Sequence, residues 1–105
     1  MSKNQLIVQL PMANASDFDA LVRIEDTLIQ AFEQNRCAVV DGHDAGQGRF
    51  NIFLLPTGAW APVIDRVKAF LKLRGVLSEA VIAKRLKSER YVVVWPEGYV
   101  GGFEL

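Results

Sequence analysis

The sequence is poor in the residues that build covalent or metal-bound frameworks. Its 105 residues include one cysteine and one histidine. A lone cysteine excludes an intrachain disulfide framework and the paired spacing of a zinc ribbon or a redox motif. Such cysteine usage is typical of a reducing compartment, so we expect a cytoplasmic protein. The chain is long enough to bury a core without these staples, which become necessary mainly below about 40 residues.

Long apolar runs are also missing. No stretch approaches the roughly 20 apolar residues that a membrane-spanning helix requires, and the apolar run near the N-terminus is too short for the core of a signal peptide. Half of the residues are hydrophobic and 23% are charged, as in an ordinary globular domain. We therefore expect a single domain over residues 1–105, with residues 96–105 as a glycine-rich tail and no membrane partner.

The sequence has no excess of charge of either sign. Its formal net charge is zero, whereas a nucleic-acid-binding protein usually presents a net basic surface that displaces phosphate counterions. The charges are unevenly distributed, because residues 1–60 carry a balance of −3 and residues 61–105 a balance of +3. We interpret the two halves as complementary within one fold and expect no nucleic-acid partner.

What the sequence does contain is an alternation of strand and helix patterns. Short apolar and β-branched runs predict strands over residues 6–10, 36–41, 49–55, 79–86 and 90–95. Apolar stripes at helical spacing predict a first helix over residues 17–34 and a second from residue 60 to the stop signal at Gly75. The segment between the second and third strands predicts a long, glycine-rich turn.

The resulting order, β-α-β-β-α-β-β, begins with the split βαβ arrangement of ferredoxin-like domains. Right-handed crossovers place both helices on one face of an antiparallel sheet and make the first and third strands central. We therefore predict an α+β fold, a ferredoxin-like sandwich with two helices over one sheet face.

The sheet face away from the helices is expected to be unusually apolar. Strand alternation assigns five residues to it: Ile7, Gln9, Asn51, Phe53 and Leu55. A bare patch of this size is unusual in a soluble monomer. We expect it to be covered by a second copy in a homodimer, by the C-terminal tail through Tyr99 and Phe103, or by another protein.

The predicted turn holds one imidazole and two carboxylates, on Asp41, His43 and Asp44. These groups suit zinc, manganese or iron and also general acid–base chemistry. Their spacing matches no strong metal or catalytic motif, whereas Asp-Gly followed by further glycines is typical of a turn. The segment is first a structural turn, then a loop that contacts a partner, and only third a metal or catalytic site. We assign no catalytic residue, metal or cofactor.

The segment around this turn resembles a pattern found in small bacterial α/β proteins, D-G-H-x-x-G-x-G-x-x-N-I-F, followed by W-P near the C-terminus. The residues that carry the resemblance are Asp41, Gly42, His43, Gly46, Gly48, Asn51, Ile52 and Phe53, together with Trp95 and Pro96. The resemblance implies a bacterial, cytoplasmic protein and carries over no catalytic residue.

The sequence therefore favours a non-enzymatic protein-interaction or regulatory domain that acts through its open sheet face as a homodimer. One alternative is a small metal-dependent or acid–base enzyme that uses Asp41, His43 and Asp44. Another alternative is a small-molecule sensing domain, since open sheets can pair to form pockets at an interface.

Overall fold

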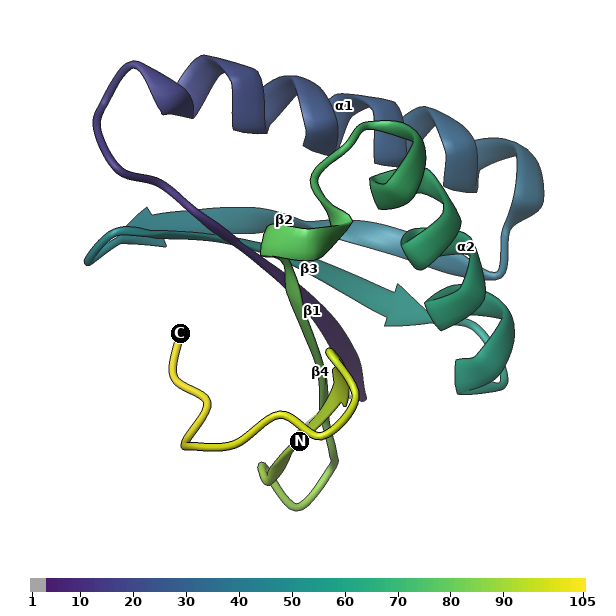
Figure 1. The fold of residues 1–105 in the computed structure, drawn as a ribbon. Helices are drawn as coiled ribbons and strands as arrows, with labels where there is room; N and C mark the ends of the chain where they lie inside the picture. The colour runs from purple at the N-terminus through teal and green to yellow at the C-terminus, as the bar shows by residue number, and fades with distance from the viewer. Residues whose placement is uncertain (1–3) are drawn as a thin grey trace.

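The computed structural model describes residues 4–105 and shows an α+β protein, as the sequence predicted. The elements are β1 (Gln5–Pro11), α1 (Asp17–Asn35), β2 (Ala38–Gly46), β3 (Arg49–Pro56), α2 (Trp60–Leu73), the short 3-10 helix η1 (Leu77–Glu79), β4 (Val81–Arg85) and β5 (Tyr91–Trp95). Both helices lie on one side of the sheet, and the C-terminal segment lies on the other side (Figure 1).

The five strands form one sheet in the order β2-β3-β1-β4-β5, and every neighbouring pair is antiparallel. β1 is central and β3 lies beside it, as predicted. β2 and β5 are the two edge strands. β2 is the longer edge, with nine residues against five.

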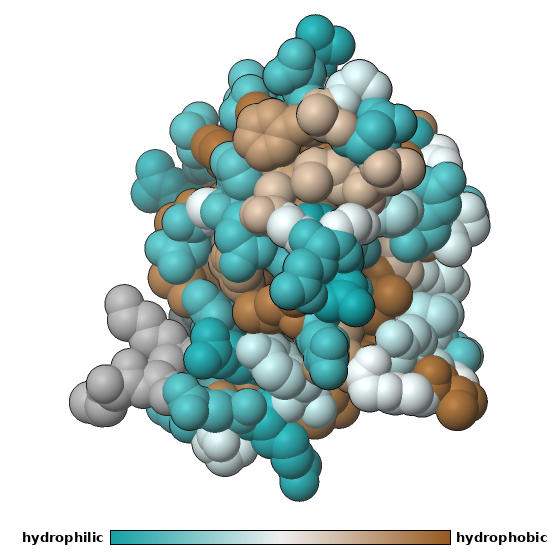
Figure 2. All heavy atoms as spheres, turned by 90° about the vertical axis from the view of Figure 1, so that its left-hand side faces the viewer, coloured by the Kyte–Doolittle hydropathy of each residue, from teal (hydrophilic) through white to brown (hydrophobic). Residues whose placement is uncertain are grey.

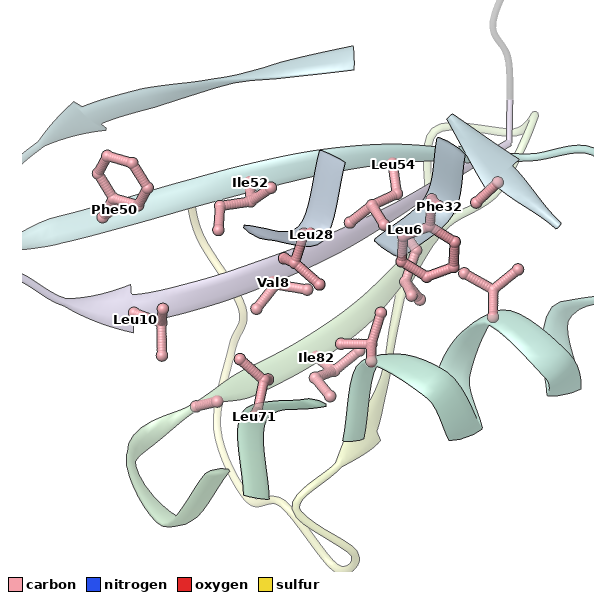
Figure 3. Packing of buried hydrophobic residues seen from close by; sticks show 14 of the residues in the cluster. Leu6, Val8, Leu10, Leu28, Phe32, Phe50, Ile52, Leu54, Leu71 and Ile82 are labelled. Carbon is pink, nitrogen blue, oxygen red and sulfur yellow. The ribbon is translucent and has the colours of Figure 1, made fainter. Parts of the chain in front are cut away.

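The hydrophobic core fills the space between the sheet and the helices (Figure 3). The strands contribute the even-numbered residues that alternation assigns to the helix side: Leu6, Val8, Leu10, Phe50, Ile52, Leu54 and Ile82. Leu28 and Phe32 of α1 and Leu71 of α2 pack against these side chains from the helix layer. Each such burial contributes roughly 1.5–3 kcal/mol in transfer terms.

The predicted long turn between the second and third strands is wrong. β2 continues to Gly46, so that only Gln47 and Gly48 separate it from β3. Both of these residues have positive φ, 52° and 77°, which is typical of the type I′ turn that joins strands by two residues. The glycines suggested a loop, but pairing with β3 holds most of the segment in the sheet.

Two further boundaries differ from the prediction. The second strand starts at Ala38 rather than Arg36, because Arg36 adopts a left-handed conformation with φ 64° and ends α1. Glu79 belongs to η1, and the fourth strand begins only at Val81. In both cases the residues predicted to begin the strand belong to the end of the preceding helix.

The C-terminal segment, residues 96–105, lies against the sheet face away from the helices (Figure 1). Gln9 Nε2 donates to the backbone oxygen of Glu104 at 2.7 Å, and Arg49 Nη1 donates to that of Leu105 at 3.2 Å. The Tyr91 and Phe103 rings lie 5.3 Å apart. The tail is therefore one of the covers expected for this face.

Candidate functional site

β2 places His43 and Asp44 on opposite faces of the sheet, because successive side chains of a strand alternate. His43 points toward α1, where its Nδ1 lies 2.7 Å from Glu25 Oε1. On the other face, Asp44 Oδ1 accepts a hydrogen bond from Asn51 Nδ2 at 2.9 Å. Two of the three residues that formed the predicted site are therefore separated by the sheet itself.

Asp41 takes part in neither contact. It lies where the β2–β3 register shifts between Val40 and Gly42, a β-bulge, and it is exposed. Gly42 has φ +133° there, a conformation that favours glycine. Within residues 4–105, the structure contains no cluster of three or more side chains that could hold a metal ion.

The Glu25–His43 pair joins α1 to the edge strand β2. Glu25 is 5% exposed, and the His43 side chain is 31% exposed. A buried carboxylate is costly unless it is paired and hydrogen-bonded. The imidazole therefore makes the burial of Glu25 possible, and every buried side-chain polar atom in the described part of the chain has a partner.

Two aromatic rings hold the imidazole in place. The His43 ring stacks on Phe50 with centroids 4.8 Å apart, and Phe18 meets it edge-on at 5.7 Å. A carboxylate-bound imidazole with a second ring nitrogen could act as a general base. However, neither His43 nor Glu25 lines the groove beside β2 or the cavities beside β5 and η1. The geometry is that of a helix-to-strand tie.

Our reading of the sequence missed Glu25. The buried face of α1 contains Leu21, Leu28 and Phe32, and Glu25 lies between them one turn after Leu21. Charged residues are rarely buried unless they are paired. A glutamate inside the apolar stripe of a helix is a signal that the sequence does contain. It indicates a buried carboxylate that needs a hydrogen-bond partner elsewhere in the chain.

On the opposite face, three polar side chains form a row across three strands, which we call the amide row: Gln9 of β1, Asn51 of β3 and Asp44 of β2. These residues are direct cross-strand partners. Gln9 Nε2 donates to Asn51 Oδ1 at 3.0 Å, and Asn51 Nδ2 donates to Asp44 Oδ1. Asn51 is 1% exposed. Such a satisfied polar row helps to fix the strand register.

The other members of the candidate interface lie on the same face as the amide row. Ile7 pairs directly with Phe53, and Leu55 pairs with the exposed Val39 at the sheet edge. Ile7 is fully buried, whereas Phe53 and Leu55 are half-buried. The five predicted residues therefore share one face, but Ile7 and Asn51 are not accessible on it.

A cavity of about 550 Å³ lies between β5 and the C-terminal segment. Its walls include the aromatic residues Tyr91, Tyr99 and Phe103 and the aliphatic Val93.

Seen from the left-hand side of Figure 1, where the β2–β3 hairpin ends, the molecular surface is mainly hydrophilic with smaller hydrophobic groups between (Figure 2).

Comparisons with models of protein families, with curated proteins and with solved structures give no match for this chain. In residues 4–105, neither helix has the length and the apolar character needed to cross a membrane.

Proposed function

We propose that this chain is a non-enzymatic protein-interaction domain that forms a homodimer through the sheet face opposite its helices. In this proposal β1 to β4, in the order β2-β3-β1-β4, form a ferredoxin-like framework. β5 extends that framework by one edge strand.

The observation that supports the proposal most is the kind of cover on this face. Ile7 is buried there outside the helix-side core, beneath a face that the irregular, glycine-rich residues 96–105 cover. The hydrogen bonds that the Gln9 and Arg49 side chains donate to the tail end on its backbone oxygens. A cover held in this way can be replaced by the same segment of a second copy.

We infer that two copies exchange their C-terminal segments. Each Glu104 would then accept a hydrogen bond from Gln9 of the other copy, and each Phe103 would meet the other copy's Tyr91. Exchange of an identical element costs little, because the contacts made are those that were lost. Pro96, Glu97 and Gly98 are exposed and provide the hinge.

Light scattering coupled to gel filtration tests the dimer. Phe53→Lys places a charge in the half-buried centre of the proposed interface and is expected to give a monomer. Leu73→Lys, at a residue of α2 that is 87% exposed, is the matched control and is expected to remain dimeric. A wild-type protein that stays monomeric at every concentration would contradict the proposal.

The cavity beside β5 supports a second candidate, small-molecule sensing. Its volume of about 550 Å³ lies within the usual range of ligand pockets. The fluorescent dye 1-anilinonaphthalene-8-sulfonate is a suitable probe for its aromatic wall. Val93→Phe should fill the cavity and reduce dye binding, while Leu73→Phe should not. Equal dye binding by both variants would dismiss this site.

A further inference from the structure

The edge strand β2 borders an apolar groove on its helix side. The groove has a volume of about 530 Å³ and lies between the end of α1 and the start of β2. The residues that matter for its chemistry are Ile29, Phe32, Glu33, Arg36, Val39 and Val40. It is therefore an apolar channel with one acidic side chain and one basic side chain.

The outer edge of β2 has no neighbouring strand in the described sheet. An edge strand presents unpaired backbone N–H and C=O groups to any extended chain that approaches. A helix-flanked groove beside such an edge is the arrangement in which extended peptides add a strand and place alternate side chains in pockets. The bulge between Val40 and Gly42 interrupts the regular edge. A peptide can therefore pair regularly with β2 before the bulge or after it.

The groove and the β2 residues beside it carry two acidic side chains, Glu33 and Asp41, against one basic side chain, Arg36. Glu33 lines the groove and Asp41 follows it on β2, and both are exposed. This charge favours a positively charged partner.

We propose that β2 and its groove bind an extended peptide in which basic and apolar residues alternate. The peptide backbone pairs with the outer edge of β2. One apolar side chain enters the groove between Phe32 and Val40, and lysine or arginine side chains face Glu33 and Asp41. The groove is lined by the end of α1 and the start of β2, whereas the proposed dimer uses the sheet face away from the helices, so this proposal does not depend on the dimer.

A second copy is a poorer occupant of the same edge. Antiparallel pairing of two β2 strands about a two-fold axis between Gly42 and His43 would place Asp41 of each copy opposite Asp44 of the other. Like charges opposite each other destabilise a strand pair. A basic peptide meets the same carboxylates with opposite charge.

Fluorescence anisotropy with labelled heptapeptides tests the charge preference. A peptide of alternating lysine and valine is expected to bind at least about tenfold more tightly than one of alternating glutamate and valine. The difference should shrink as salt rises, because exposed charges are screened. Equal affinity of the two peptides would overturn the proposal.

Two matched pairs of charge reversals locate the site. Glu33→Lys with Asp41→Lys is expected to weaken binding of the basic peptide by about tenfold. The control, Asp65→Lys with Glu79→Lys, changes exposed acidic residues away from the groove and should weaken it by less than about twofold. Equal losses in both variants would show a non-specific charge effect and overturn the site.

Amide hydrogen exchange identifies the strand that is paired. Bound basic peptide should slow exchange along β2 and leave β5, the other edge, unchanged. Slower exchange at β5, or at no strand, would overturn the proposal. Exchange at β2 that slows with rising protein concentration in the absence of peptide would also overturn it, because a second copy would then be the occupant. Phe53 does not line the groove, so Phe53→Lys should bind the peptide like the wild type, and failure of the dimer and failure of this site are distinguishable.

Discussion

At the scale of single residues, two polar contacts explain most of the motif that stood out in the sequence. His43 turns toward the helices to meet Glu25, and Asn51 turns away to meet Gln9 and Asp44. The two faces of one hairpin therefore carry two independent polar contacts. In both, every buried polar atom has a hydrogen-bond partner, and both contribute to the position of the edge strand.

His43→Ala removes the partner of a buried carboxylate. Because Glu25 would then be buried and unpaired, we expect a loss of about 2–3 kcal/mol in the free energy of unfolding. Urea denaturation followed by circular dichroism measures this loss. The double variant Glu25→Leu/His43→Ala removes the charge as well and should recover part of it. A single variant as stable as the wild type would mean that the pair is not formed.

Asn51→Ala breaks the amide row at its buried centre. Gln9 and Asp44 each lose a partner, and we expect destabilisation of about 1–3 kcal/mol. Thermal unfolding is the appropriate measurement, with the exposed Gln30→Ala on α1 as the control. If both variants unfold at the wild-type temperature, the row has no structural role.

The residue scale also shows how far the sequence could lead. Strand alternation correctly placed Gln9 and Asn51 on the face away from the helices. It could not assign their partners, because Asp44 becomes adjacent to Asn51 only through the β2–β3 register. The Glu25–His43 pair spans 18 residues along the chain, so only the packing of α1 on β2 reveals it.

At the scale of elements, the β2–β3 hairpin is the clearest departure from prediction. Glycines at 42, 46 and 48 suggested one long loop, yet only Gly48 lies in the turn itself. The other two accompany a bulge and the end of a strand. Local glycine content indicates where the backbone departs from regular geometry, but not whether strand pairing continues.

The type I′ turn predicts opposite changes in the free energy of unfolding for substitutions at its two residues. Gln47→Asn should stabilise the protein by about 0.5 kcal/mol, because Asn-Gly is favoured in type I′ turns and Asn tolerates positive φ. Gly48→Ala should destabilise it by about 1 kcal/mol, because its φ of 77° disfavours a Cβ. Chemical denaturation of the two variants side by side gives both signs. Stabilisation by Gly48→Ala would contradict the turn type.

At the scale of the whole molecule, the layers and the central strands followed from the order of helix and strand patterns, because crossover handedness and chain connectivity leave few arrangements. The segment that covers the second sheet face could not be predicted in the same way. An irregular segment such as residues 96–105 has no periodic pattern that predicts its position, and the hydrogen bonds that it accepts from the Gln9 and Arg49 side chains end on its backbone oxygens.

Deletion of residues 96–105 tests the role of the cover. The shortened chain should retain its helical circular dichroism, because the helix-side core does not involve the tail. Ile7 and its neighbours would lose their cover, so we expect a lower free energy of unfolding and loss of the exchanged dimer. Urea denaturation and gel filtration measure the two effects. A deletion variant that still dimerises would exclude segment exchange.

The link between Gln9 and Glu104 has a practical consequence for spectroscopy. The same Gln9 amide group donates to both Asn51 and the tail, so departure of the tail alters the magnetic environment of these side-chain NH₂ groups. Their nitrogen-15 resonances therefore provide a built-in reporter, which needs no attached label, of whether the C-terminus is seated.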